Sequence, residues 1–242
     1  MNIFDYLLDL VYPHKNRCLH CGKTIDYDEV GGLCYDCLKK INFISKYCSI
    51  CGREYAGGNT DICQECRRHK PFFEQARAVA LYEGLFRELI LKFKYDGQKE
   101  LLRPFGGLMY LYFSKYYKNK DIEYILSVPL SEEKKIIRGF NQADLLAREL
   151  AQREQISYLD DYLVRSMDTL PFWNLDYQQR KREISGIFKI QYRYNRIKGK
   201  NILLIDDIFT TGATTNEISK ILKEEARVKR VYILTLATAA SI

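Results

Sequence analysis

Apolar residues recur in two patterns along most of the chain. Continuous apolar runs, which predict strands, fall at residues 76–82, 124–128, 161–165, 187–190, 202–205 and 230–238. Apolar residues at helical spacing, which predict helices, fall at residues 85–93, 99–117, 143–150 and 218–222. Buried strands that alternate with helices are typical of a parallel sheet covered by helices, so the pattern predicts the α/β fold class.

The N-terminal part differs, because its apolar residues are few and its cysteines are frequent. Residues 3–11 have helical spacing, which predicts a short amphipathic helix that ends before Pro13. A basic stretch at residues 67–71 separates this part from the strands and helices that follow. We therefore expect two domains, a cysteine-rich one at residues 1–72 and an α/β one at residues 73–242.

Net charge and hydropathy indicate which class of partner the protein binds and in which cellular compartment it is expected. The formal net charge of +7 favours anionic partners such as phosphates and nucleic acids. No apolar run has the length of a transmembrane helix, and the N-terminus carries Asp5 and Asp9 and lacks the basic start of a signal peptide. We expect a cytoplasmic protein, in which cysteines bind metal more often than they form disulfides.

The cysteines form four Cys-x-x-Cys pairs, which are Cys18/Cys21, Cys34/Cys37, Cys48/Cys51 and Cys63/Cys66. Glycine follows the first and third pairs, and the gaps inside the two halves are similar, at twelve and eleven residues. This internal repeat predicts two structural zinc sites with four cysteine ligands each. We pair the ligands sequentially, and a cross-braced pairing is the alternative. Sulfur fills every position, so neither site is open for catalysis.

The candidate ligand site lies where the apolar run at residues 202–205 ends. Asp206 and Asp207 follow directly, and a small, hydroxyl-rich loop precedes the next helix, with the residues Thr210, Thr211, Gly212, Ala213 and Thr214. A helix N-terminus favours an anion, and glycine lets the backbone approach it closely. Two carboxylates accept hydrogen bonds from two neighbouring hydroxyls. A phosphate beside a vicinal diol describes a ribose 5-phosphate, although a capped helix beside a solvated turn is the simpler alternative.

Two further segments carry basic residues. The loop after the strand at residues 124–128 contains Lys134, Lys135 and Arg138 and suits a pyrophosphate, although a basic loop alone is weak evidence. Residues 166–185 lack an apolar pattern, and a loop of that length in a compact domain is often a lid. Basic residues beside aromatic ones also suggest a single-stranded DNA groove, with scattered surface charge as the alternative: Tyr47, Arg53, Tyr55, Arg67, Arg68 and Phe72.

The segment from Leu204 to Thr214 resembles the motif with which type I phosphoribosyltransferases bind 5-phosphoribosyl-1-pyrophosphate (PRPP). With the cysteine pairs, the chain resembles the competence protein F (ComF) family over nearly its whole length. The other matching segments are Val128-Pro129-Leu130, Arg138-Gly139-Phe140-Asn141-Gln142 and Arg180-Lys181-Arg182 leading to Phe188. The chain departs from the family pattern at Glu183, where asparagine is common, and at residues 225–227, where a Gly-Ala turn is usual.

The resemblance implies a double zinc ribbon followed by a type I phosphoribosyltransferase-like domain that binds Mg·PRPP. It places Asp206 and Asp207 on the ribose hydroxyls and residues 210–214 around the 5-phosphate. It assigns Pro129, Leu130, Arg138 and Gly139 to a pyrophosphate loop, and it assigns Arg180, Lys181 and Arg182 to a mobile loop.

The resemblance also implies a role in natural competence and DNA uptake, with single-stranded DNA and other competence proteins as partners and membrane association through them. Two functions stay open. One is a phosphoribosyltransferase with an unknown acceptor, for which Asp206 and Asp207 are the first catalytic candidates. The other is a non-catalytic adaptor that senses PRPP and binds DNA or competence partners through its zinc ribbons and basic loops.

Overall fold

The computed structural model describes residues 17–25, 31–55, 57, 60–166, 186–191 and 195–239. The predicted helix at residues 3–11 and the predicted mobile-loop residues Arg180, Lys181 and Arg182 lie outside these ranges.

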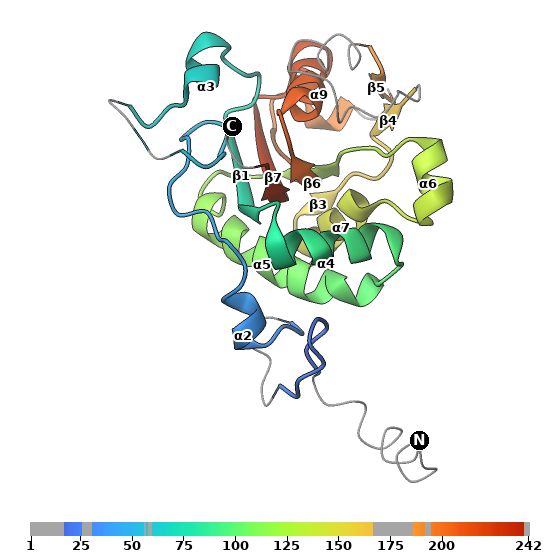
Figure 1. The fold of residues 1–242 in the computed structure, drawn as a ribbon. Coiled ribbons are helices and arrows are strands. Elements are labelled where there is room, and N and C mark those ends of the chain that lie inside the picture. The colour runs from blue at the N-terminus through green and yellow to red at the C-terminus, as the bar shows by residue number, and fades with distance from the viewer. Residues whose placement is uncertain are drawn as a thin grey trace.

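The described part of the chain is built on a five-stranded parallel sheet (Figure 1). In spatial order its strands are β1 (Gln75–Leu81), β7 (Arg230–Thr238), β6 (Asn201–Phe209), β2 (Tyr124–Ser127) and β3 (Ser157–Tyr158). The central strands β6 and β7 are almost wholly buried, as expected for strands covered on both faces. The predicted α/β class, a parallel sheet flanked by helices after a cysteine-rich region, is confirmed.

Helices cover both faces of the sheet (Figure 1). One face carries α4 (Gly84–Tyr95), the 3-10 turn η1 (Lys99–Leu101), α5 (Leu102–Tyr116) and α7 (Gln142–Glu154). The other face carries α9 (Ala213–Glu224), the 3-10 turn η3 (Asn195–Ile197) and an antiparallel pair, β4 (Leu163–Arg165) with β5 (Phe188–Ile190). Alternate residues of β6 enter the two cores, Leu203 facing α4, α5 and α7 and Leu204 facing α9.

The cysteine-rich region has two similar halves. The first contains the bridge between Arg17 and Thr24 and the short helix α2 (Tyr35–Leu38). The second contains the bridge between Tyr47 and Glu54 and the short helix α3 (Gln64–Arg68). The matching bridges agree with the internal repeat in the sequence.

The second half is joined to the edge strand β1 by backbone and side-chain contacts. The Ala76 N–H donates to the Ile50 carbonyl at 2.7 Å. The buried Arg77 guanidinium donates to the Ser49 carbonyl at 3.1 Å and lies over the Tyr47 ring, 4.5 Å from its centroid. These contacts cross the predicted domain boundary, so this half of the cysteine-rich region packs as part of the α/β core.

In the α/β part of the chain, two elements differ from the sequence-based expectation besides the short elements β3 and η3, which were not predicted. The basic segment after β2 was expected to be a loop, but it contains the helix α6 (Glu132–Arg138). All residues of α6 are described and none is buried, so this helix has no apolar face to reveal it in the sequence. Strand β6 also continues through Asp206 and Asp207 to Phe209, whereas the apolar run stops at Ile205.

Gly52 and Gly22 provide a matched test of the junction with β1. Both have positive φ, +70° and +73°, but a Cβ on Gly52 would lie 2.3 Å from the Ala76 carbonyl oxygen, while a Cβ on Gly22 would have nothing within 4 Å. Left-handed strain costs either alanine variant about 1–2 kcal/mol. In addition to this strain, we predict that Gly52→Ala lowers the free energy of unfolding by about 1–3 kcal/mol because of the clash with β1.

Urea unfolding of the two zinc-loaded variants measures the difference. Equal destabilisation of Gly52→Ala and Gly22→Ala would contradict the described packing of the second half against β1.

Candidate functional site at the carboxyl end of the sheet

The two aspartates lie at the carboxyl end of β6, beside the end of β2. The register pairs Ser127 of β2 with Ile205, the residue before Asp206. The Asp207 N–H donates to Asp206 Oδ1 at 2.8 Å, which fixes the first carboxylate against the backbone. Ligands of open α/β sheets bind at this end of the strands.

Residues 210–214, here called the phosphate loop, connect β6 to α9. Gly212 is the N-cap of α9 with φ of +78°, and an added Cβ would lie 2.4 Å from the Phe209 ring. The loop is held from both sides, because Thr215 Oγ1 donates to the Gly212 carbonyl at 3.1 Å and Thr238 Oγ1 donates to the Phe209 carbonyl at 2.8 Å. The first turn of a helix has N–H groups without intrahelical acceptors, which suit an anion.

The aspartates differ in their electrostatic surroundings. Lys94 Nζ lies 2.7 Å from Asp207 Oδ2, and these side chains are only 10% and 16% exposed. Asp206 is half-buried and lacks such an ion pair among the described residues. Burial and the adjacent Asp207 charge raise the pKa of Asp206 to about 8. A bound cation or a hydroxyl donor would relieve this cost.

Three basic side chains interact with the aspartates, and a fourth, Arg165, acts on one of these three, Lys134. Lys94 lies in the last turn of α4, Lys134 and Arg138 belong to α6, and Arg165 ends β4. The pKa of Lys134 is lowered, first by burial and then by the charges of Arg165, Arg138 and Lys94, while Asp207 opposes this shift. Cations held this close together favour an anion between them.

Arg138 is held in a defined orientation. Its guanidinium donates to the Tyr95 hydroxyl at 3.0 Å and to Gln142 Oε1 at 3.1 Å. It also lies over the Tyr95 ring, 4.9 Å from the centroid. Gly139, in the left-handed conformation, ends α6 directly after it.

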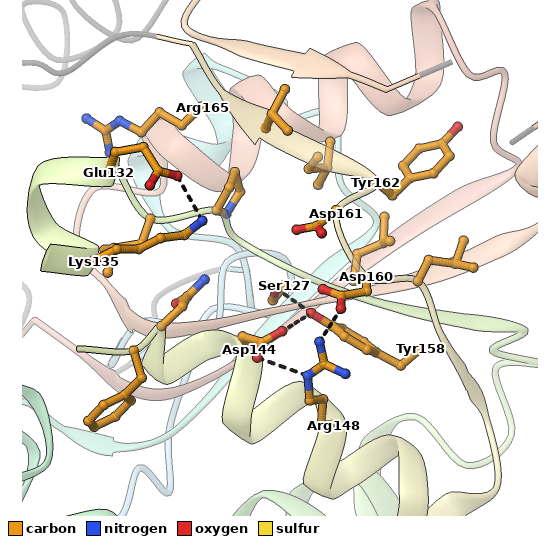
Figure 2. Close-up of a pocket in the computed structure, with 18 of the residues that line it drawn as sticks. Ser127, Glu132, Lys135, Asp144, Arg148, Tyr158, Asp160, Asp161, Tyr162 and Arg165 are labelled. Carbon is orange, nitrogen blue, oxygen red and sulfur yellow. Dashed lines mark hydrogen bonds and ion pairs between the residues drawn. The ribbon is translucent and has the colours of Figure 1, made fainter. Parts of the chain in front are cut away.

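A polar cavity of about 360 Å³ lies at the carboxyl ends of β2 and β3 (Figure 2). Pro129, Leu130 and Gly139 of the predicted pyrophosphate loop line it, whereas Asp206 and Asp207 do not. The residues predicted from sequence to bind the ligand therefore lie in two neighbouring places, near the end of β6 and along this cavity at the ends of β2 and β3.

A hydrogen-bonded network forms one wall of the cavity (Figure 2). The Tyr158 hydroxyl contacts Ser127 Oγ at 2.9 Å and donates to Asp144 Oδ1 at 2.5 Å. Arg148 bridges Asp144 and Asp160. Burial and then the hydrogen bond to Asp144 raise the pKa of Tyr158 well above its usual range, so its hydroxyl stays a donor.

This network is not among the features predicted from the sequence. Asp144 and Arg148 have the spacing of an ordinary ion pair on a helix surface. Tyr158 joins them only because the short strand β3 pairs with β2. The pairing of Asp144 with Arg148 was the one local signal available.

The structure brings the cysteines together in two tetrads paired sequentially. Within each tetrad the sulfur atoms lie within 4.8 Å of one another: Cys18, Cys21, Cys34 and Cys37 in the first, and Cys48, Cys51, Cys63 and Cys66 in the second. The Cys21–Cys34 and Cys51–Cys63 sulfur distances are 3.7 and 3.8 Å. A tetrahedral zinc with Zn–S bonds of about 2.3 Å separates its ligands by about 3.8 Å, so both tetrads fit structural zinc.

Only some of the residues expected to form a DNA groove are exposed. Tyr47 contacts Arg77 and Tyr116, and Arg53 is held beside Cys51, so these two side chains face the protein. Arg67, Arg68 and Phe72 are exposed. No helix in the described ranges has the length and apolar character needed to cross a membrane.

Comparison with known proteins gives matches over the whole chain. A double zinc ribbon domain family matches residues 7–76. Competence protein F of Haemophilus influenzae is 31% identical over 245 residues, which cover 99% of this chain and 100% of that protein. Competence protein ComFC of Bacillus subtilis is 29% identical, covering 92% and 95%. The DNA utilization protein YhgH of Escherichia coli K12 is 25% identical, covering 79% and 84%.

Among solved structures, a crystal structure of adenine phosphoribosyltransferase matches 63% of this chain and 71% of its own, at 19% identity and a TM-score of 0.34. A hypoxanthine phosphoribosyltransferase from Staphylococcus aureus matches 62% and 64%, at 18% identity and a TM-score of 0.33. TM-scores this low do not assign a fold. The fold class of this chain is assigned from its own parallel sheet and flanking helices.

The raised pKa of Asp206 predicts a pH dependence of stability. A carboxyl group whose pKa rises on folding contributes stability below its unfolded pKa of 3.8, and this contribution is lost as the pH rises towards about 8. From pH 5 to pH 8.5, the free energy of unfolding of the wild type should fall relative to Asp206→Asn by about 1–3 kcal/mol, allowing for solvent screening.

Denaturant unfolding of both proteins across this pH range measures the effect, and the subtraction removes the titration of distant groups. A difference that does not change with pH would contradict the described burial of Asp206.

Proposed function

Since the chain belongs to the competence protein F family, we propose that it binds Mg·PRPP at the carboxyl end of β6 and acts in competence or DNA utilisation. The observation that carries the proposal is the placement of Asp206 and Asp207 shortly before the phosphate loop, beside the basic side chains of Lys94, Lys134 and Arg138. A pair of carboxylates that can bind the ribose diol, between two elements that can each bind an anion, matches the ribose, the 5-phosphate and the pyrophosphate of PRPP. We further propose that residues 73–242 form a type I phosphoribosyltransferase-like domain and that residues 1–72 form the ribbon domain.

Each part of PRPP has candidate partners. The 5-phosphate would accept hydrogen bonds from backbone N–H groups and hydroxyls of the phosphate loop, with Gly212 allowing close approach. The ribose 2- and 3-hydroxyls would donate to Asp206 and Asp207. The raised pKa of Asp206 supports this role, because such donors stabilise its ionised form.

The pyrophosphate would lie toward α6. Lys134 and Arg138 supply positive charge there, and Arg165 adds to it from β4. Pro129, Leu130 and Gly139 line the neighbouring cavity. Their assignment to the pyrophosphate loop stays a prediction. The same holds for Arg180, Lys181 and Arg182 as a mobile loop, since they lie outside the described residues.

Magnesium fits the donor set at the end of β6. Two carboxylates are adjacent there and, among the described residues, only Asp207 is paired with a lysine, Lys94. Oxygen ligands of this kind suit Mg²⁺. Bound with PRPP, Mg²⁺ would supply positive charge that neutralises the pyrophosphate as a leaving group. Asp206 and Asp207 would orient the ribose, and the phosphate loop would fix the 5-phosphate. Zinc in the two cysteine tetrads would have a structural role.

The polar cavity beside β2 favours transfer over sensing alone. It has the volume of a small-molecule site and begins one strand away from the aspartates. It would admit a small polar acceptor, whose identity the cavity does not specify. A non-catalytic adaptor, which senses PRPP and binds single-stranded DNA or competence partners, is the second candidate function. The exposed residues Arg67, Arg68 and Phe72 favour it.

The test of the PRPP site is the thermal stability of the zinc-loaded protein with Mg²⁺ and PRPP. Ligand at one hundred times its dissociation constant should add about 2.7 kcal/mol to the free energy of unfolding. In the Asp206→Ala/Asp207→Ala double variant we expect this ligand-dependent gain to be lost, because the ribose hydroxyls have no acceptors.

The Gly22→Ala variant, altered far from the phosphate loop, is the control and should keep the gain. A wild type whose stability is unchanged by millimolar PRPP would contradict the proposal. If PRPP does bind, release of pyrophosphate in the presence of candidate acceptors separates the enzyme from the sensor.

A further inference from the structure

The second cysteine tetrad lies directly against the phosphate loop. One crevice is lined by Cys51 and Cys66 of this tetrad and by Thr211 and Gly212 of the phosphate loop. The crevice has a volume of only about 20 Å³. Because this is little more than the space that one water molecule needs, the cysteine loops and the phosphate loop are in close contact.

Two aromatic rings connect the tetrad to the loop. Phe73 and Phe209 are buried in the same core cluster as Cys51 and Cys66, and their ring centroids lie 6.1 Å apart, edge to face. The Phe209 ring in turn occupies the space into which a Cβ on Gly212 would project. A displacement of the tetrad would therefore reach the glycine of the phosphate loop through these rings.

A hydrogen bond makes a second connection. The Phe72 N–H donates to Asn216 Oδ1 at 2.7 Å, and the Asn216 N–H donates to the Gly212 carbonyl at 2.9 Å. Asn216 thus links the segment after the second tetrad to the first turn of α9. Farther along the helix, Lys223 pairs with Glu74 at 2.8 Å and continues the same junction.

The first tetrad has a different environment. Cys18, Cys34 and Cys37 share a buried cluster with residues of α4 and α5. None of the first-tetrad cysteines is among the residues that line the crevice beside the phosphate loop. Two units with similar local sequences therefore contact different parts of the α/β core.

We infer that the second tetrad, when it holds zinc, positions the phosphate loop, and that Phe73 and Asn216 are the positioning residues that connect them. The inference rests on the proposed binding of PRPP at this loop. Structural zinc strongly stabilises small cysteine units, so bound zinc would keep the surface behind Phe209 in place. Thermodynamic linkage then requires that zinc in the second tetrad and phosphate at the loop strengthen each other's binding.

Asn216→Ala tests the connection while leaving all the cysteines in place. We expect it to weaken binding of ribose 5-phosphate by about fivefold, the loss typical of one hydrogen bond, and to leave the affinity for pyrophosphate unchanged. Pyrophosphate is the internal control, because it depends on the basic cluster at α6 rather than on the phosphate loop. Phe73→Leu, which removes the contact between rings, should have the same selective effect.

Asn42→Ala is the matched control variant. Asn42 also connects the cysteine-rich region to the core, through a hydrogen bond from its amide to Glu83, but it is not among the residues that line the crevice beside the phosphate loop. It should bind both ligands as the wild type does. Calorimetric titration of each zinc-loaded protein, with two zinc ions per chain verified beforehand, gives the affinities.

Release of zinc to a chromogenic chelator gives the reciprocal measurement. Ribose 5-phosphate should slow the release of one zinc ion per chain and leave the other unaffected, and Asn216→Ala should remove this protection. If Asn216→Ala and Phe73→Leu both bind ribose 5-phosphate as tightly as the wild type does, the inference is overturned, while the proposed function is not affected. A wild type that binds neither ribose 5-phosphate nor Mg·PRPP would instead contradict the proposed function.

Discussion

The ion pair between Lys94 and Asp207 is the interaction on which the site depends. Strand β6 is buried on both faces, yet two adjacent carboxylates lie near its carboxyl end. Lys94, from the last turn of α4, compensates one of them at 2.7 Å. The other, Asp206, bears the cost of burial, as its raised pKa indicates. Adjacent carboxylates with this difference favour a ligand that brings hydroxyl donors and a cation.

The order of the strands explains why positive charge gathers at the same place. Because β2 pairs with β6, the segment that follows β2 must lie beside the aspartates. That segment is α6, an exposed helix that carries Lys134 and Arg138. Its exposure is consistent with a role in binding, since a helix without buried residues contributes little to the core.

Much of this arrangement could be predicted from sequence where the signal is local. The apolar run before Asp206, the loop around Gly212 and the spacing of the cysteines each lie within a short segment. The helix α6 could not be predicted from its apolar pattern, because none of its residues is buried. The network around Tyr158 depends on pairing between distant strands. Gly22 and Gly52 show the same limit, since their local sequences match while only Gly52 is pressed against β1.

The most direct test is a crystal structure of the protein with Mg·PRPP bound. The account predicts electron density for the 5-phosphate at the phosphate loop, for the ribose hydroxyls at Asp206 and Asp207, and for the pyrophosphate beside Lys134 and Arg138. Density for PRPP located elsewhere, or a ligand whose ribose lies away from both aspartates, would contradict it.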